Sequence, residues 1–378
     1  MAIYHSLGTA LVTREELLEK RQEMEALKAG ALKEISFSTG SASLEAATVP
    51  VHILAEGAVK VEFKPIGLGR PLTVRIGSVY PGNLPPKGGL FGKKRGVMIS
   101  SAVKSWQSFE AQPRALNILK QRVEKNQVIP GPAATEEGTP LVFYSPALTD
   151  RSLILTFEMA FDNVDESFFT GIGEVFQSAG GLPIFASAQP YLLAAGVLFN
   201  LGGAIGNAIF DSRAEFQGTE ELYFKVPGEE ITPAGFALIS RSPLDEATLK
   251  SHFIQETGEL VDQTSGAPYH GDIPYVVVSL DGTEDKKLEE FSATAASAGL
   301  MKQFYNVREG SSTSSEILVD ALKYYNDFRY RKEAQELQER LAEATEENEK
   351  KEIQAQLDAV LKNIQTPWFK PDGGDGQA

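Results

Sequence analysis

The chain of 378 residues contains no cysteine. This absence excludes disulfide bonds, thiolate metal sites, cysteine nucleophiles and redox sensing through a thiol. Histidine is also rare, and a multi-histidine metal site would have to gather nearly all of His5, His52, His252 and His270. We therefore expect no metal, and no motif in the chain implies a cofactor.

Basic residues are fewer than acidic ones, since 36 Lys and Arg face 51 Asp and Glu and leave a net charge of -15. Such a chain repels a phosphate backbone unless a strong local patch intervenes, so we expect no nucleic-acid partner. Residues 1–10 lack the cationic start and long apolar run of a secretory signal. We expect a cytoplasmic location, with peripheral attachment to a membrane as the alternative.

Residues 175–210 contain no Asp, Glu, Lys, Arg or His, in a protein that is 23% charged. Within them, residues 191–210 would be long enough as a helix to cross a hydrocarbon core of roughly 30 Å. Two interpretations stay open for this segment. It forms the central helical layer of a soluble core, or it is a hydrophobic hairpin that leaves the core for a membrane or a partner. In the second case Leu193, Leu198 and Phe199 are the expected contact residues.

Short runs with a period of two dominate residues 34–161 and are separated by Gly, Pro and Ser. This alternation is typical of strands with one buried face. A helix is expected to interrupt them from Pro113 to Lys125, because proline is well tolerated in a first helical turn. The expected strands contain Ile35/Phe37, Val49/Val51/Ile53, Val59/Val61/Phe63, Leu72/Val74/Ile76, Val97/Ile99, Val142/Tyr144 and Leu153/Leu155/Phe157.

Other local signals predict further helices and strands. Thr13 and Glu16 have the spacing of a capping box and predict a helix that starts there. The continuous apolar run Pro274–Leu280 is typical of a strand buried on both faces at the centre of a sheet. Further strands are expected at 222–226 and 235–239, and helices at 165–210, after a Ser242 N-cap, and at 287–304.

Residues 314–364 contain neither Gly nor Pro and are rich in good helix formers. The apolar stripe of Leu337, Leu341 and Ala344 does not share a heptad phase with the stripe that begins at Ile353. We therefore expect a break or a helical hairpin around Glu346–Glu352 rather than one long coiled coil.

The fold class expected from these patterns is α+β. It has an antiparallel, β-rich, sandwich-like body, an apolar helical layer and a charged helical C-terminal extension. The expected organisation is an N-terminal helix in 1–33, the β-rich body in 34–310 with the apolar layer at 165–211, a charged helical or helical-hairpin region in 311–366, and a flexible tail in 367–378.

Three weak chemical motifs remain. Ser101 and Lys104 have the serine–lysine spacing of some acyl enzymes, and His270 with Asp272 has the composition of a base and the carboxylate that orients it. These four residues are the only candidates that the sequence offers for the catalytic groups of a serine-type hydrolase. Lys93, Lys94 and Arg95 form a basic loop within residues 87–96 that would suit an anionic group, although the loop lacks the spacing of a nucleotide-binding P-loop.

These motifs identify no protein family and form no coherent catalytic set. We therefore expect a non-enzymatic interaction or effector module, with the hydrolase and the anion-binding module as alternatives. The expected partners are another protein or a second copy, bound through the terminal helices, and a membrane is the alternative. Besides the apolar segment, the expected interaction residues are Leu337, Leu341, Trp368 and Phe369, the last two lying between prolines near the C-terminus.

Overall fold

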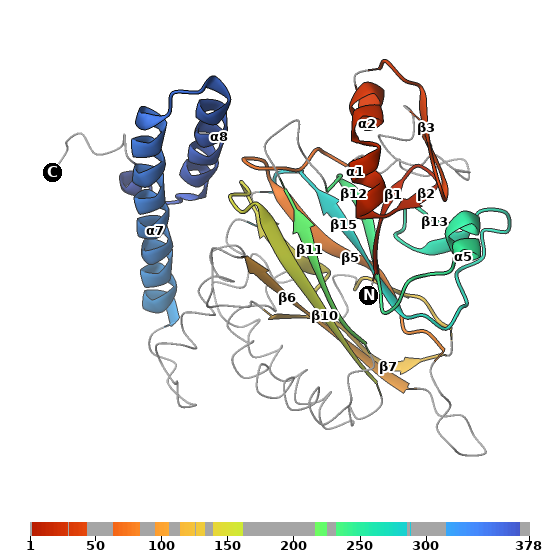
Figure 1. Cartoon of the computed structure of the whole chain (residues 1–378). Coiled ribbons are helices and arrows are strands. Elements are labelled where there is room, and N and C mark those ends of the chain that lie inside the picture. Colours follow the sequence, from red (N-terminus) through yellow and green to blue (C-terminus); the bar gives the residue numbers. More distant parts are fainter. Residues whose placement is uncertain are drawn as a thin grey trace.

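The computed structural model in Figure 1 describes the greater part of the chain and confirms the α+β class, with antiparallel sheets and a few helices. The expected strands at residues 49–61, the helical segment 165–211 and nearly all of the helix expected at 287–304 lie outside the described residues. The described residues are 2–28, 30–43, 63–83, 95–105, 114–124, 126–132, 139–161, 216–224, 232–285, 288 and 315–370.

Two antiparallel sheets form the body. The seven-stranded sheet has the order β2-β1-β12-β15-β5-β8, and β9 pairs beside β8 along β5. Its strands are β1 (Ala2–Leu7), β2 (Ala10–Val12), β5 (Leu72–Tyr80), β8 (Ile129–Pro130), β9 (Leu141–Ser145), β12 (Gly235–Ser240) and β15 (Tyr275–Asp281). The four-stranded sheet has the order β11-β10-β6-β7, with β6 (Arg95–Ser105), β7 (Arg114–Val123), β10 (Ser152–Phe161) and β11 (Phe216–Tyr223).

The main hydrophobic core lies between these two sheets, as in a sandwich. Leu155 and Phe157 of β10 and Ile99 of β6 are fully buried on one side, and Val74 of β5 and Val278 of β15 are fully buried on the other. Alternation along each strand places every second side chain in this layer. The strands predicted around Leu72, Val97, Val142 and Leu153 are confirmed as β5, β6, β9 and β10.

A second apolar layer covers the other face of the seven-stranded sheet. Tyr80 and Tyr275 lie in it, together with residues of α5 (Glu246–Ser251) and of the hairpin β13 (His252–Ile254) and β14 (Leu260–Asp262). The strand predicted at 274–280 is therefore confirmed as β15, buried on both faces at the centre of its sheet.

The N-terminal region begins with two strands that the sequence analysis did not predict. β1 pairs with β12, and β2 folds back on β1 through a turn at Gly8–Thr9. The predicted helix follows as α1 (Arg14–Glu19) and α2 (Arg21–Lys28) and packs near the strand pair β3 (Glu34–Phe37) and β4 (Gly40–Ser43). Thr13 caps it by accepting the Glu16 amide at 3.3 Å, while the Glu16 carboxylate accepts the Ser38 amide at 2.8 Å.

The helix predicted from Pro113 to Lys125 is wrong, because residues 114–123 form β7. The register between β6 and β7 shifts twice, between Arg95 and Val97 and between Ile99 and Ser100. These irregularities break the period of two, so the apolar residues of β7 are spaced like those of a helix. The cap of α5 is also one turn later than predicted, since Asp245 rather than Ser242 accepts the Thr248 amide, at 2.7 Å.

The C-terminal extension is a helical hairpin, as predicted. α7 (Ser315–Glu343) and α8 (Glu347–Asn363) pack antiparallel around Ala334, Leu337 and Leu357. The helices separate at residues 344–346, at the start of the charged stretch in which the break was expected. In Figure 1, α8 lies between α7 and the sheets.

The buried His5 of β1 gives the fold a testable pH dependence. Burial lowers the pKa of its imidazole from 6.5 to about 4, and the Nδ1 atom has no hydrogen-bond partner. Below pH 6.5 the imidazole of His5 binds a proton in the unfolded chain but not in the folded chain. The contribution of the neutral His5 to the free energy of unfolding is therefore fully present above pH 6.5. It is lost as the pH falls towards 4, by at most about 3 kcal/mol.

We expect a His5→Gln variant to lose less of its free energy of unfolding than the wild type between about pH 7 and about pH 4.5. Urea unfolding at several pH values measures this difference. Replacement of the exposed His270 by Gln is the control and should leave the wild-type pH dependence in place. An unchanged slope in the His5 variant would contradict the assignment.

Candidate functional site

Ser101 lies in β6 with its side chain in the core between the two sheets. It pairs with Phe157 of β10, is 2% exposed, and its hydroxyl has no hydrogen-bond partner. Lys104 follows three positions later and pairs with Ile154, on the opposite face of the strand by alternation, and its side chain lies outside the described residues. A substrate has no access to a hydroxyl buried in this way.

His270 and Asp272 are exposed in the loop that precedes β15. This loop belongs to the layer on the far side of the seven-stranded sheet, where Tyr80 donates a hydrogen bond to the Gly271 carbonyl at 2.7 Å. The seven-stranded sheet therefore separates this loop from Ser101. The structure does not bring the four hydrolase candidates together.

The other predicted sites are only partly described. Lys93 and Lys94 lie outside the described residues, and Arg95 is described only in its backbone, at the start of β6. Leu193, Leu198 and Phe199 also lie outside. The anion-binding loop and the apolar segment therefore stay predictions.

A cluster of buried tyrosines lies beneath the His270 loop. Tyr80 stacks on Tyr275 with ring centroids 5.3 Å apart and meets Tyr269 edge to face at 5.4 Å. Burial is the main cause that raises the pKa of Tyr80, and the nearby Tyr269 and Asp272 raise it further. These phenols stay neutral at physiological pH, so they serve as packing groups and hydrogen-bond donors rather than as bases.

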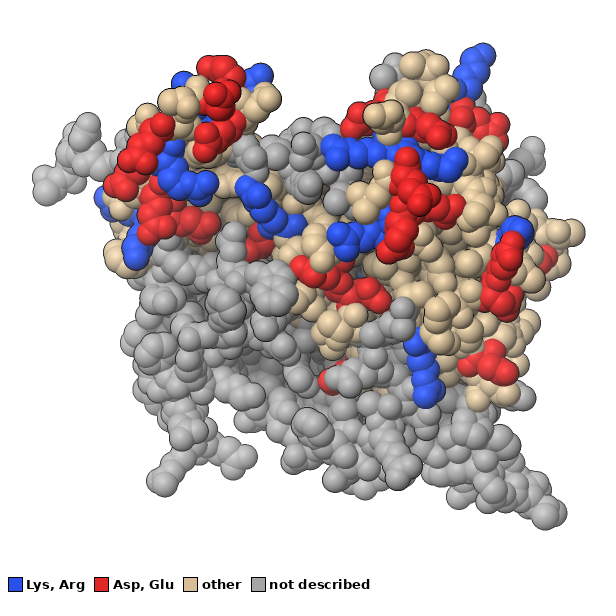
Figure 2. Space-filling view, in the orientation of Figure 1, with Lys and Arg blue, Asp and Glu red and all other residues tan. Residues whose placement is uncertain are grey.

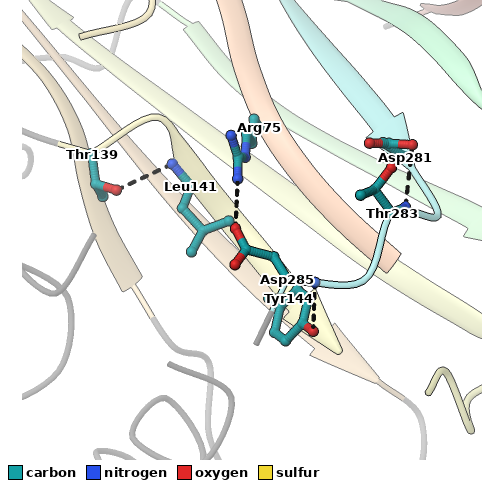
Figure 3. A network of polar contacts seen from close by, with 7 residues as sticks. All are labelled: Arg75, Thr139, Leu141, Tyr144, Asp281, Thr283 and Asp285. Atoms are coloured by element: carbon teal, nitrogen blue, oxygen red, sulfur yellow. Dashed lines mark hydrogen bonds and ion pairs between the residues drawn. The ribbon is translucent and has the colours of Figure 1, made fainter. Parts of the chain in front are cut away.

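The polar contacts drawn in Figure 3 tie the end of β15 to β5 and β9. Arg75 Nη2 lies 3.7 Å from Asp285 Oδ2, and the Asp285 amide donates to the Tyr144 hydroxyl at 3.3 Å. Asp281 accepts the Lys64 amide at 2.9 Å and the Thr283 amide at 3.3 Å. The Asp281 carboxylate is thus occupied by two backbone amides and the Asp285 carboxylate by a guanidinium. Among the described residues, no His, Asp and Glu side chains gather as metal ligands would.

The C-terminal end of the chain forms a more distinctive arrangement. The short helix η3 (Pro367–Phe369) lies against α7, and Asp327 of α7 holds the segment that leads into it. The two carboxylate oxygens of Asp327 accept the amides of Gln365 and Thr366, each at 2.9 Å. Asp327 is 1% exposed, so a buried anion fixes the end of the chain against α7.

Large apolar side chains are exposed on α7 next to Asp327 and on η3. Phe328, next to Asp327, is 58% exposed and Trp368 of η3 is 60% exposed. Basic residues are near both in the sequence, namely Arg331 and Lys332 in α7 and Lys362 and Lys370 on either side of the Thr366 turn. We call Phe328, Arg331, Lys332, Lys362, Trp368 and Lys370 the C-terminal corner.

The hairpin is docked on the sandwich through α8. A side chain on Gly69 would meet the Ala355 carbonyl at 3.3 Å and the Ala359 methyl at 3.9 Å, so the helix approaches the chain closely there. Asn363 donates to the Ala147 carbonyl at 3.0 Å, and Lys362 reaches the Gly69 carbonyl at 3.4 Å. Because α8 makes these contacts, α7 lies on the side of the hairpin away from the sheets (Figure 1).

The predicted interaction residues of this region divide into two groups. Leu337 is buried between α7 and α8, and Leu341 packs against the same cluster, so both serve the hairpin itself. Trp368 is exposed and Phe369 is half-buried. The sequence analysis missed Asp327 and Phe328. The offset of Phe328 from the buried Ala334 and Leu337 places it on another face of α7.

Comparisons of the sequence with protein-family models and with curated proteins give no match. Among the described residues, no helix has both the length and the apolar character that a membrane crossing requires. The candidate site therefore rests on the geometry of the C-terminal corner.

Substitution of Ser101 tests the core packing that keeps its hydroxyl from a substrate. Because its buried hydroxyl has no partner, the Ser101→Ala variant should be as stable as the wild type or more stable by up to about 1 kcal/mol. Ser78→Ala is the matched control: Ser78 is equally buried but donates to the Gly258 carbonyl at 2.6 Å, so its loss should cost about 1–2 kcal/mol. Chemical denaturation compares the two, and strong destabilisation by Ser101→Ala would contradict the packing described.

A substitution of Asp327 tests whether its carboxylate holds residues 365–366 against α7. In Asp327→Asn one side of the side chain becomes an N–H donor that faces a backbone donor, so hydrogen exchange at Gln365 and Thr366 should accelerate tenfold or more, an effect of about 1.5–3 kcal/mol. Asp358→Asn is the control, because Asp358 is exposed and accepts a hydrogen bond from the Gln354 side chain at 2.8 Å. Equal exchange in the two variants would show that Asp327 does not hold the segment.

Proposed function

We propose that this protein is a non-enzymatic interaction module whose main docking surface is the C-terminal corner. One observation carries the proposal. Among the described residues, the large apolar side chains with high exposure are Phe328, Trp368, Leu18 and Leu32, and the two aromatic ones, at 58% and 60%, exceed the leucines at 44% and 37%. Both aromatic residues belong to the corner.

The way in which the corner is held supports a role in binding. Exposed aromatic side chains gain free energy when a partner covers them, and Trp is among the residues most enriched at the centres of interfaces. A side chain that is fixed before binding loses little conformational entropy on binding. The buried Asp327 and the packing of η3 on α7 hold the backbone that carries Trp368 in place.

Parts of the chain outside the corner also bear on this function. A non-enzymatic role agrees with the burial of Ser101 and with its separation from His270 and Asp272. The uncharged segment 175–210 would add a second surface for a membrane or a partner. We place the protein in the cytoplasm, at times peripheral to a membrane.

Site-specific photo-crosslinking in expressing cells tests this proposal and does not require the partner to be identified beforehand. A benzophenone amino acid replaces Lys332 in the corner or, as a control, Lys250 of α5. Both lysines are exposed and each forms an i,i+4 pair with a glutamate. We expect several-fold more adducts to protein or lipid at position 332 than at 250, because position 332 lies in the docking surface and position 250 does not.

The second arm combines the crosslinker at position 332 with Phe328→Ser and Trp368→Ser. These exposed substitutions should remove the adducts while thermal unfolding stays close to that of the wild type. Equal yields at positions 332 and 250, or adducts that survive the double substitution, would refute the docking surface.

A further inference from the structure

The C-terminal corner is basic in an acidic protein. Four of its six residues are basic, namely Arg331, Lys332, Lys362 and Lys370, and none is acidic, whereas the chain as a whole carries a net charge of -15. Of the acidic residues that flank 328–332, Asp327 is buried and accepts two amides, and Glu333 is half-buried. The corner therefore presents cations beside the two exposed aromatic side chains.

The arrangement on α7 brings these two kinds of side chain to one face. Phe328, Arg331 and Lys332 stand at i, i+3 and i+4, which are neighbouring positions on a helix. Lys332 also lies 3.9 Å from Glu336, an exposed pair of the kind that contributes little. Trp368 adds the second aromatic side chain from η3, and Lys370 directly follows η3.

A concentration of negative charge on the hairpin lies away from the corner, at the turn between the two helices. Glu343, Glu346, Glu347 and Glu349 surround the turn between α7 and α8, which is the upper end of the hairpin in Figure 2. From Phe328 to Glu343 the helix rises about 22 Å. This is more than two Debye lengths, each about 8 Å, at physiological salt. The acidic turn therefore leaves the field at the corner largely unchanged.

Resting on the proposed function, we infer that the C-terminal corner docks on an anionic lipid surface, with Trp368 and Phe328 entering the headgroup region and the basic residues contacting acidic headgroups. Trp is the side chain most suited to this interface, because its ring is apolar and its N–H is polar. Anionic headgroups attract clustered Lys and Arg near the surface, and the apolar side chains supply the second attachment that stable binding requires.

The exposure of both aromatic side chains favours lipid over a protein partner. A protein would need two matching pockets for side chains that stand out from the surface by more than half of their area. A lipid interface deforms around them without a preformed pocket. A second copy of this chain fits less well, since the acidic turn of its hairpin, residues 343–352, offers charge but no large apolar side chain.

Sedimentation of the full-length protein with vesicles tests the inference. We expect binding to phosphatidylcholine vesicles that contain about one-third phosphatidylserine, and at least tenfold weaker binding without phosphatidylserine or at high salt. Phe328→Ser with Trp368→Ser, and separately Lys332→Glu with Lys370→Glu, should each weaken partitioning about tenfold or more. Leu18→Ser with Leu32→Ser, and Lys250→Glu, are matched controls and should bind as the wild type does.

Fluorescence gives an independent readout of the insertion. The chain has two tryptophans, so Trp106→Phe leaves Trp368 as the reporter. Its emission should shift to the blue on addition of the phosphatidylserine vesicles and not with phosphatidylcholine alone. No shift, absence of binding, or binding that the corner variants leave unchanged would overturn the inference.

The two proposals fail separately. Protein adducts at position 332 without vesicle binding would remove the lipid inference and leave the docking surface intact. Absence of both adducts and vesicle binding would remove both.

Discussion

The burial of β15 on both faces is the constraint on which the rest of the structure depends. Val276, Val278 and Leu280 face the four-stranded sheet, whereas Tyr275 and Val277 face the layer formed by α5, β13 and β14. A shift of one residue in the pairing would exchange these two faces. The register with β5 nevertheless changes between Val277 and Val278, where the extra residue of β5 is Gly77. This bulge keeps Ile76 and Val79 on the same core face, and Gly77 suits it because a side chain there would lie 3.3 Å from Gly258.

The placement of β5 in turn positions the C-terminal hairpin. The segment just before β5 contains Gly69, whose positive φ of 76° is readily adopted by glycine. The Gly69 amide donates to the Leu148 carbonyl and the Leu148 amide to the Arg70 carbonyl, each at 2.8 Å, so two loops of the sandwich form one platform. The small residues Ala355 and Ala359 allow α8 to rest on this platform. The helix that carries Phe328 is thereby linked to the body through α8, against which it packs.

The parts of the fold that sequence could predict are those in which one local signal is dominant. The strands around Val74, Ile99 and Phe157 alternate cleanly, and the run 274–280 is apolar throughout. The out-of-phase stripes of Leu337 and Ile353 predicted the hairpin. β7 was mistaken for a helix because its pairing with β6 is irregular. β1 was missed because a six-residue strand with His5 and Ser6 on its buried positions looks polar, although the Gly8–Thr9 turn before Ala10 was a usable hairpin signal.

The candidate site was less predictable, since its geometry depends on contacts between distant positions. The separation of Ser101 from His270 follows from which face of the seven-stranded sheet each one occupies, and no spacing in the sequence encodes that relation. The role of Asp327 likewise arises only when residues 365–366 return to α7, 38 and 39 positions later.

The net charge of the protein gives the basic corner a directional effect. A protein with a net charge of -15 is repelled by an anionic surface, so approach through most faces is unfavourable. Only a face where cations outnumber anions within about one Debye length meets attraction. The corner supplies such cations in Arg331, Lys332, Lys362 and Lys370, beside the C-terminal end of α8, with the sandwich held behind α8 (Figure 1). Repulsion of the body and attraction of the corner then act together to select one orientation, which neither the aromatic side chains nor the cations would impose alone.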